Sequence, residues 1–355
     1  MLTKLLNNLH WVFNGVLSRE ELSAQKIHLT SRPQFLIVDP TSRCNARCVM
    51  CYQSFHALDN PGSDLPLAVF KKIAPLISTA SHINLFSTGE PSLAKEIEYV
   101  LKETQHRASL QAEIWTSTNG KNVTEAMLCY LIRPQMGLQF SVDGGTKEVF
   151  ENIRRGISFE ELCSTLKRVN QRKGNSHFPR LSFSSCISKR NIHDLRNIFR
   201  LAQKYHVEQV IFYEEDPEVP EENDYILDED DRNVFLEQLP TIEETKISYQ
   251  NGLTFQGSRR FSTQAEPVKH QGQLSCLAPW KVFHLRADGT VRVCCTLRQV
   301  MGNLSYSTFD EVWNGAEYVK LRHAFVSQEN IPSTCCNCSD PLRTWGEVAT
   351  HRDRI

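Results

Sequence analysis

The sequence has no excess of charge and no long apolar run. Its 40 Lys and Arg residues face 41 Asp and Glu residues, which leaves a formal net charge of −1 over 355 residues. This balance gives no overall field to attract nucleic acid or an anionic membrane. No stretch reaches the roughly 18 consecutive apolar residues of a membrane-spanning helix. We expect no nucleic-acid partner and no membrane span, and residues 1–17 lack a signal-peptide pattern.

Cysteine, in contrast, is abundant. There are twelve, and nine of them fall within residues 44–51, 276–295 and 335–338. A chain of this length can build a core without disulfide bonds. Clustered cysteines then favour metal binding in a reducing compartment, so we expect a cytoplasmic protein.

The first cluster follows an apolar run, residues 35–38, that is typical of a strand. Cys44, Cys48 and Cys51 are spaced x3 and then x2. Three soft thiolates on one short loop suit three corners of an iron–sulfur cube and leave one iron open. A tetrahedral zinc site would need a fourth nearby ligand, and no residue downstream extends a usual zinc spacing. A disulfide loop or buried free thiols are the alternatives.

This arrangement resembles the signature of the radical S-adenosylmethionine (SAM) superfamily. An aromatic residue usually precedes the third Cys there, whereas here Met50 precedes it and Tyr52 follows. The resemblance implies that Cys44, Cys48 and Cys51 hold a 4Fe–4S cluster whose open iron is chelated by SAM. It further implies an electron donor such as flavodoxin or ferredoxin, reductive cleavage of SAM, and a 5′-deoxyadenosyl radical that abstracts hydrogen from substrate.

After this loop the chain alternates strands and helices, the pattern of parallel βα units. Strands are predicted near residues 35–39, 83–87, 112–117, 138–142, 181–187 and 209–213. Helices are predicted near residues 67–79, 94–106, 124–132, 158–173, 192–205 and 229–239. The count agrees with the family fold, an α/β six-stranded partial (β/α)6 barrel. Chemistry in such barrels sits at the C-terminal ends of the strands.

The second strand ends in Thr88-Gly89-Glu90-Pro91. Gly89 lets a backbone approach a ligand closely, and Glu90 can accept from an ammonium group. The stretch resembles the family's GGEP motif, with Thr88 in place of the first Gly, and the resemblance implies that Gly89 and Glu90 bind the amino group of SAM. The alternative is a simple turn.

Polar residues also end the next three strands. The resemblance implies cofactor contacts for four of them: Thr118, Asn119, Ser141 and Asp143. Asn-Gly and Asp-Gly turns are the alternative.

Alternation in the fifth strand places Cys186 on the barrel lumen, where a thiol could give a hydrogen atom to a carbon radical. A small buried filler is the alternative. The stretch 154–156, Arg-Arg-Gly, resembles related sequences without an assigned role.

The second constellation lies at the C-terminus. The spacing C-x12-G-x4-C from Cys276 through Gly289 to Cys294, followed by C-x2-C, resembles the SPASM/twitch extension of radical SAM enzymes. The resemblance implies a small α+β module with one auxiliary 4Fe–4S cluster held by Cys276, Cys294, Cys335 and Cys338. Cys295 and Cys336 remain spare or alternate ligands. A structural zinc site with four cysteine ligands is the alternative.

Four regions follow: a helical lead at 1–34, the barrel at 35–214, an acidic connector at 215–270 and the auxiliary-cluster domain with its tail at 271–355. Leucines in the lead recur at helical spacing, which predicts a helix packed on the barrel; a membrane-surface or partner-binding helix is the alternative. The connector is either a solvated loop or a negative rim for a cationic substrate.

The implied reaction is oxidation or epimerisation of a small sugar-like or natural-product metabolite. The absence of a fused peptide-recognition domain and the single auxiliary cluster favour this small molecule. Modification of a ribosomal peptide or protein side chain by the same chemistry is the alternative. A non-enzymatic metal-binding scaffold is more remote, because a scaffold needs no SAM pocket. Donation of hydrogen from Cys186 would make the enzyme an epimerase.

Overall fold

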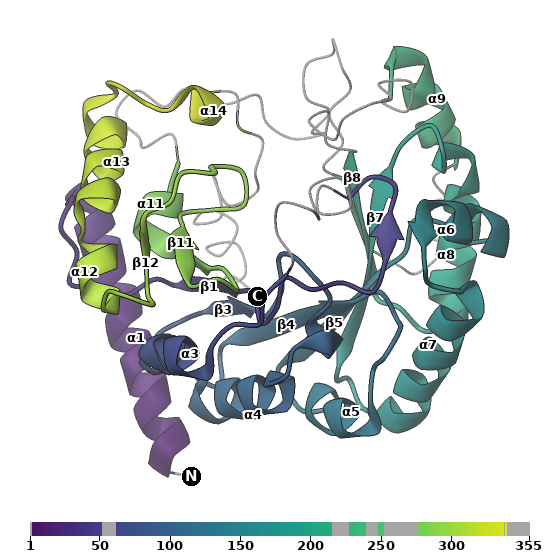
Figure 1. Cartoon of the computed structure of the whole chain (residues 1–355), viewed down its shortest axis with the longest axis horizontal. Helices are drawn as coiled ribbons and strands as arrows, with labels where there is room; N and C mark the ends of the chain where they lie inside the picture. Colours follow the sequence, from purple (N-terminus) through teal and green to yellow (C-terminus); the bar gives the residue numbers. More distant parts are fainter. Residues whose placement is uncertain are drawn as a thin grey trace.

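The computed structural model of the chain describes residues 2–51, 62–214, 227–238, 248–251, 276–336 and 338. Its main feature is one curved, open sheet of ten strands in the order β12-β11-β10-β1-β3-β4-β5-β7-β8-β9. The sheet bends into an arch, with helices along its convex side (Figure 1). The concave side faces the loops that carry the first cysteine cluster.

Six consecutive parallel strands form the barrel wall, as predicted. They are β1 (Phe35–Val38), β3 (His82–Asn84), β4 (Glu113–Thr118), β5 (Met136–Ser141), β7 (Arg180–Ile187) and β8 (Gln209–Glu214). The helices between them are α3 (Leu67–Ile73), α4 (Ile97–Arg107), α5 (Glu125–Leu131), α6 (Lys147–Ile153), α7 (Phe159–Lys173) and α8 (Leu195–Lys204), followed by α9 (Glu229–Gln238). Short 3-10 turns are η1 (Ala74–Ser78), η2 (Pro91–Leu93) and η3 (Ile192–Asp194).

The core lies between this wall and its helices. Phe140, Phe183 and Phe212, on three neighbouring strands, are completely buried. Local sequence also fixes the helix ends: Ser158 and Glu161 form a reciprocal capping box at the start of α7, which satisfies two backbone donors that the first turn leaves free. Alternating burial along β4 gives the strand one core face and one less buried face.

Strands outside the predicted barrel extend the sheet at both ends. Beyond β8, β9 (Ser248–Asn251) adds another parallel strand. Beyond β1, the C-terminal module contributes β10 (Val282–Leu285), which pairs with β1 in parallel. The antiparallel strands β11 (Thr290–Arg292) and β12 (Gly302–Asn303) follow. The turn between β10 and β11 contains Gly289 at φ +82°, a conformation that favours glycine.

The lead forms helix α1 (Leu2–Ser23), which packs beside α4 and η1. The predicted helix is confirmed, but its apolar side does not pack on the barrel. Asn7, Asn14, Ser18 and Glu21 are buried, whereas Phe13 is 72% exposed. The helix is held mainly by polar side chains such as Asn14 and Glu21, which form hydrogen bonds with backbone groups of neighbouring segments. Within the described residues, no helix is both long and apolar enough to span a membrane.

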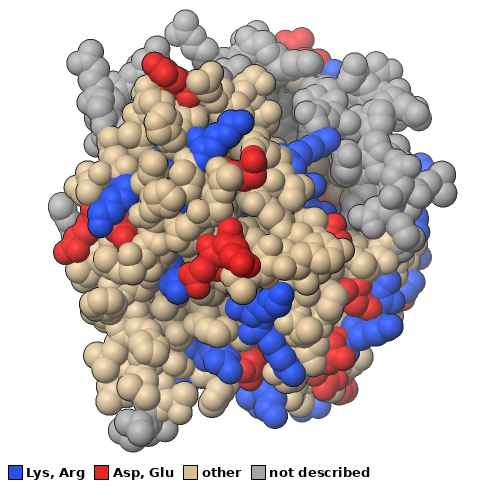
Figure 2. Space-filling view, turned by 60° about the vertical axis from the view of Figure 1, so that its left-hand side comes forward, with Lys and Arg blue, Asp and Glu red and all other residues tan. Residues whose placement is uncertain are grey.

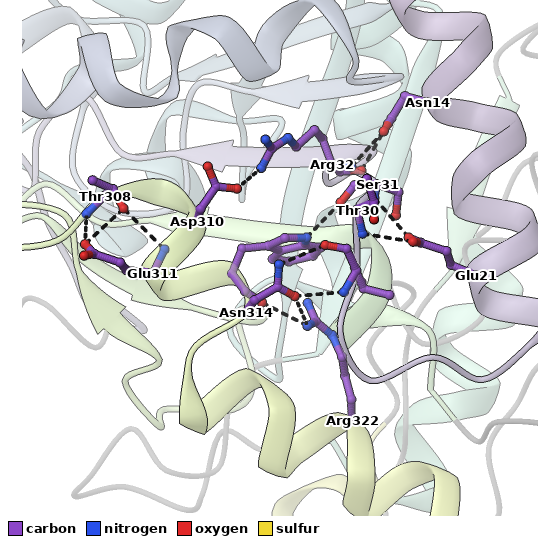
Figure 3. A network of polar contacts seen from close by, with 12 residues as sticks. Asn14, Glu21, Thr30, Ser31, Arg32, Thr308, Asp310, Glu311, Asn314 and Arg322 are labelled. Atoms are coloured by element: carbon purple, nitrogen blue, oxygen red, sulfur yellow. Dashed lines mark hydrogen bonds and ion pairs between the residues drawn. The ribbon is translucent and has the colours of Figure 1, made fainter.

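Polar contacts tie the segment after α1 to the C-terminal module (Figure 3). Glu21 accepts hydrogen bonds from the backbone N–H groups of Thr30 and Ser31 at 2.9 and 3.0 Å. Trp313 donates to the carbonyl of Ser31 at 2.9 Å, and the buried Arg322 donates to the carbonyls of Ile27 and Trp313. Residues of α12 (Phe309–Trp313) and α13 (Ala316–Ser327) are thereby fixed against the lead. This module also includes α11 (Ala278–Lys281) and α14 (Ser333–Cys336).

Candidate active site

The first cysteine loop leaves the C-terminal end of β1, where barrel chemistry is expected. Cys48 lies in the short strand β2 (Arg47–Cys48), which pairs with β6 (Arg154–Arg155). The backbone N–H of Ala46 donates to the sulfur of Cys44 at 3.5 Å. Cys44 and Cys51 are partly exposed, whereas Cys48 is buried. The loop therefore presents its thiols close to the open end of the barrel.

The loop after β3 packs directly on this cysteine loop. Gly89 has φ +72°, and a Cβ there would lie 2.4 Å from the carbonyl oxygen of Thr41. The N–H of Glu90 donates to the carbonyl of Arg43 at 2.8 Å. Thr88 donates from its hydroxyl and its N–H to the buried carboxylate of Asp39 at 2.8 and 3.1 Å. These contacts explain the need for glycine and show how threonine fits the first position.

Glu90, in the loop after β3, is hydrogen-bonded to residues at the end of β4. Its buried carboxylate accepts from the Thr118 hydroxyl at 2.9 Å, the Asn119 N–H at 2.7 Å and the Ser92 N–H at 3.2 Å. The Asn119 side chain in turn donates to Asn45 of the cysteine loop at 2.7 Å. Burial raises the pKa of Glu90 above its ordinary value, and these hydrogen bonds oppose the rise. The predicted residues Gly89, Glu90, Thr118 and Asn119 thus form one connected site.

A second polar group lies at the ends of β5 and β7. Asp143 is completely buried and forms an ion pair with Arg154, with 2.6 Å between its Oδ2 and the arginine Nε. Arg154 also donates to the sulfur of Cys48 at 3.8 Å. The N–H of Cys186 donates to Asp143 at 2.7 Å. Ser141, half-buried, is opposite Ser184 in the sheet register.

Arg154 is the site residue that sequence reasoning did not assign. Burial raises the pKa of the Cys48 thiol to about 11, and the Arg154 guanidinium opposes this shift. The arginine therefore places a fixed positive charge beside a candidate cluster ligand. The stretch 154–156 resembles related sequences, but the contact between Arg154 and Cys48 depends on the pairing of β2 with β6. Sequence spacing does not reveal that pairing.

The C-terminal thiols meet at another cavity. It is lined by Cys276, Cys294, Cys335 and Cys338, with apolar walls that include Ala278, Pro279, Val293, Leu297, Leu321 and Phe325. The Leu297 N–H donates to the sulfur of Cys294 at 3.2 Å. The pKa of Cys276 is raised to about 12, mainly by burial and also by the three other thiolates. The four cysteines expected to act together are therefore neighbours.

The two remaining cysteines of this module differ. Cys295 is exposed, with its sulfur 4.0 Å from the hydroxyl of Ser87 at the mouth of the barrel. The side chain of Cys336 lies outside the described residues. Cys295 is thus placed on the barrel side of the module, whereas the four other thiols share the cavity.

Three and four clustered thiols are ligand sets that an iron–sulfur cube can use. Within the described residues, no three Cys, His, Asp or Glu side chains converge closely enough to hold one metal ion. A cube separates its thiolates at different corners, and amide donors to sulfur tune such clusters. The buried side-chain nitrogen of Asn45, without a partner among the described residues, is a free donor beside the first set. This donor and the Glu90 carboxylate suit a polar ligand such as SAM.

Comparison with known proteins agrees with this geometry. Residues 38–202 match the Radical SAM superfamily, and residues 276–339 match SPASM, an iron–sulfur cluster-binding domain. The chain belongs to the radical SAM superfamily. As a radical SAM enzyme with a SPASM domain, it uses SAM, a SAM-binding 4Fe–4S cluster and auxiliary iron–sulfur chemistry.

Two curated relatives are similar in sequence to this radical SAM enzyme. The tungsten-containing aldehyde ferredoxin oxidoreductase cofactor-modifying protein of Pyrococcus furiosus is 24% identical over 331 residues, covering 86% of this chain and 87% of the relative. The Fe-coproporphyrin III synthase of Methanosarcina barkeri is 26% identical over 185 residues, covering 49% of this chain and 42% of that protein. The second match thus spans less than half of that relative.

Solved structures show the same fold at low identity. Streptococcus suis SuiB bound to the precursor peptide SuiA has a TM-score of 0.64 and 13% identity, with 86% of this chain and 70% of SuiB covered. Native anSMEcpe with bound AdoMet and a peptide has a TM-score of 0.60 and 18% identity, with 86% and 85% covered. These likenesses confirm the α/β radical SAM architecture with its small C-terminal module.

Proposed function

We propose that this radical SAM enzyme cleaves SAM at the loop of Cys44, Cys48 and Cys51 and oxidises a small sugar-like or natural-product metabolite. The observation that carries the proposal is the chain of hydrogen bonds from Glu90 through Asn119 to Asn45. It joins a buried carboxylate to the loop of three thiols. A protein that only bound metal would have no use for an acceptor held in this position.

Glu90 supplies the recognition of the SAM amino group in this proposal. A carboxylate has about four acceptor positions, and three are used by Ser92, Thr118 and Asn119. Burial, the main cause of its raised pKa, opposes the negative charge. An ammonium group on the free position would offset that cost through a charge-assisted hydrogen bond.

Arg154 and Asp143 hold the other side of the site. The guanidinium lies between the Asp143 carboxylate and the Cys48 sulfur. Its positive charge stabilises the thiolate form that iron requires, and Asp143 fixes its orientation. When bound, the 4Fe–4S cluster supplies the electron that cleaves SAM, delivered from a donor protein of the flavodoxin or ferredoxin class.

The oxidation removes two electrons from substrate in two steps. Bound SAM would supply the group that removes a hydrogen atom from an alcohol carbon, and the substrate would then lose a proton and one further electron to become a ketone. Cys276, Cys294, Cys335 and Cys338 are the residues that would hold an auxiliary electron acceptor. The names of the two relatives, a cofactor-modifying protein and a porphyrin synthase, support a small molecule, whereas the peptides bound to SuiB and anSMEcpe support the alternative of a ribosomal peptide or protein side chain.

Epimerisation is the second candidate function, and Cys186 favours it. The thiol is partly exposed at the end of β7 and its backbone bonds to Asp143. Its S–H would give a hydrogen atom to a substrate radical, and one electron from the donor protein with one proton would restore the thiol. Ser141, which is half-buried at the end of β5, would then line the same reaction space, and Asp143 would hold the backbone of Cys186 in place.

Anaerobic reconstitution followed by analysis of 5′-deoxyadenosine, iron, sulfide and zinc tests the proposal. We expect about eight irons in the wild type, four for each thiolate set, and 5′-deoxyadenosine on addition of a strong reductant. A protein that binds zinc alone and leaves SAM intact would instead be a scaffold. Loss of deuterium incorporation from solvent in Cys186→Ala, with SAM cleavage retained, would select epimerisation over oxidation.

A further inference from the structure

Helix α1 has an outward face that is apolar and uncovered in the described structure. Eleven large apolar side chains are strongly exposed among the described residues, and six lie on α1: Leu5, Leu6, Leu9, Val12, Phe13 and Val16. Single exposed apolar residues are ordinary on a protein surface, but a contiguous patch marks an interaction site. Few charged side chains interrupt the lower left of Figure 2, where α1 lies.

The inward face of the same helix is polar and fully engaged. Lys4 donates to the carbonyls of Gln105 and Ala108 at 2.6 and 2.8 Å. The Asn14 side chain donates to the carbonyl of Arg32 and accepts from its N–H. Trp11 donates to Ser81 at 3.0 Å. Because these bonds fix the orientation of α1, the apolar face cannot turn inward without breaking them.

The spacing of the outward face indicates what covers it. Leu5, Leu9, Val12 and Val16 follow one another at intervals of four, three and four residues, the seam of a coiled coil. This order reads the same from either end. Two copies related by a two-fold axis, with their α1 helices antiparallel, would place Leu5 opposite Val16 and Leu9 opposite Val12 in every layer.

We propose that this enzyme forms a homodimer through antiparallel pairing of its α1 helices. Six side chains that are between 41% and 72% exposed supply the apolar centre of an interface between two copies, and specific interfaces bury about 800 Å² per partner. The seam contains no charge, so two identical faces do not repel each other. A membrane surface fits less well, because interfacial helices carry Lys and Arg around the apolar face, whereas Lys4 is turned inward.

Sedimentation equilibrium of the reconstituted full-length protein over a concentration series tests the pairing. We expect a dimer for the wild type. Leu9→Glu places one unpaired charge from each copy in the interface, close to the two-fold axis. The dimer dissociation constant should therefore rise at least about a hundredfold. Leu236→Glu is the matched control, since Leu236 is 50% exposed on α9, and it should leave the dimer intact.

A charge swap tests the antiparallel register. Val12→Lys alone should also weaken the dimer, whereas Leu9→Glu combined with Val12→Lys should restore it, because each Glu then faces a Lys of the other copy. A parallel pair would place like charges together and would not recover. Circular dichroism and iron content report the folding of each variant.

Three results would overturn the proposal: a monomeric wild type, a dimer insensitive to Leu9→Glu, or a double variant that stays monomeric. Flotation with anionic lipid vesicles tests the alternative that a membrane surface covers this face of α1. A monomer that binds vesicles through Leu9 would assign the face to a membrane surface instead.

Discussion

The two thiol sets of this enzyme differ in how the chain gathers them and in what surrounds them. Cys44, Cys48 and Cys51 come from one loop beside a largely buried arginine and two buried carboxylates. The other four line an apolar cavity between segments that are far apart in the sequence. For Cys276, burial and the other three thiols all raise the pKa, whereas Arg154 opposes the shift at Cys48.

This contrast indicates different tasks. The first set has charged and hydrogen-bonding groups around it that a polar ligand can use, as a cluster with an open iron requires. The second set offers four thiols and apolar walls, which suits a cluster that is fully ligated by protein and shielded from solvent. The charge of the metal itself must stabilise those thiolates.

The largest expected effect comes from removing one set and retaining the other. The triple variant Cys44→Ala, Cys48→Ala and Cys51→Ala should lose SAM cleavage entirely but keep about four irons with a 4Fe–4S spectrum. Cys129→Ala, which changes an exposed cysteine on α5, should behave as wild type. A triple variant that retains SAM cleavage, or that holds one zinc and no iron, would break the assignment of the two sets.

The charge beside the first set can be removed directly. Arg154→Met leaves the buried Asp143 without its partner, and breaking a buried ion pair costs about 3–5 kcal/mol. Urea unfolding of the cluster-free protein should show this loss, while Arg155→Met, at the exposed neighbour, should cost little. Combining Arg154→Met with Asp143→Asn, whose side-chain oxygen can still accept from the Cys186 N–H, should recover much of the stability, and failure to recover would show that the arginine acts elsewhere.

The charge of Glu90 tests whether the site beside the first thiol set binds SAM. Glu90→Gln keeps the shape but removes the charge, and a hydrogen bond to a charged group is worth about 1.5–3 kcal/mol. SAM affinity, measured by equilibrium titration of the reconstituted enzyme, should therefore fall by about one to two orders of magnitude. Glu98→Gln on the exposed side of α4 is the control. Equal affinity in both variants would reduce the Thr88–Pro91 stretch to a structural turn.

The smallest effect concerns pH in the cluster-free protein. The pKa values of Cys48 and Cys276 are raised from 9.0 to about 11 and about 12. Above pH 9 the unfolded thiols ionise while the folded ones stay protonated, so folding stability should fall with rising pH until the folded thiols titrate. Denaturant midpoints at pH 8 and pH 10 measure this fall, and Cys276→Ser should reduce it. A midpoint independent of pH would contradict the burial of these thiols.

The barrel was predictable because its signals are local and repeated. Six apolar runs separated by helical patterns produced the six parallel strands, and the Cys and Gly-Glu motifs identified a site that the structure brings together. The roles of the individual residues remain predictions. Arg154 was missed because its contact with Cys48 depends on pairing across the site, and β10 was missed because its pairing with β1 is distant in sequence.

The orientation of α1 was predicted wrongly for a related reason: the sequence favoured packing of its apolar side on the barrel and kept a membrane-surface or partner-binding helix as the alternative. Periodicity shows that a helix has an apolar side, but not which side the body contacts. Polar residues such as Asn14 and Glu21 act here as partners for backbone groups, a use that hydrophobic patterning does not detect. The acidic stretch 215–226, most of the predicted connector and the C-terminal tail lie outside the described residues.

The pairing of β1 with β10 also sets an order of events during synthesis. Phe35 pairs with Val282 and Val38 with Leu285, so one edge of the first barrel strand is left without this neighbour until the ribosome has passed the last of these residues. Unpaired strand edges are sites of aggregation in nascent and partly folded chains. A truncated translation product would thus expose an open edge beside its first three reactive thiols. Arrival of the C-terminal module covers that edge and delivers the second metal-binding set in the same step.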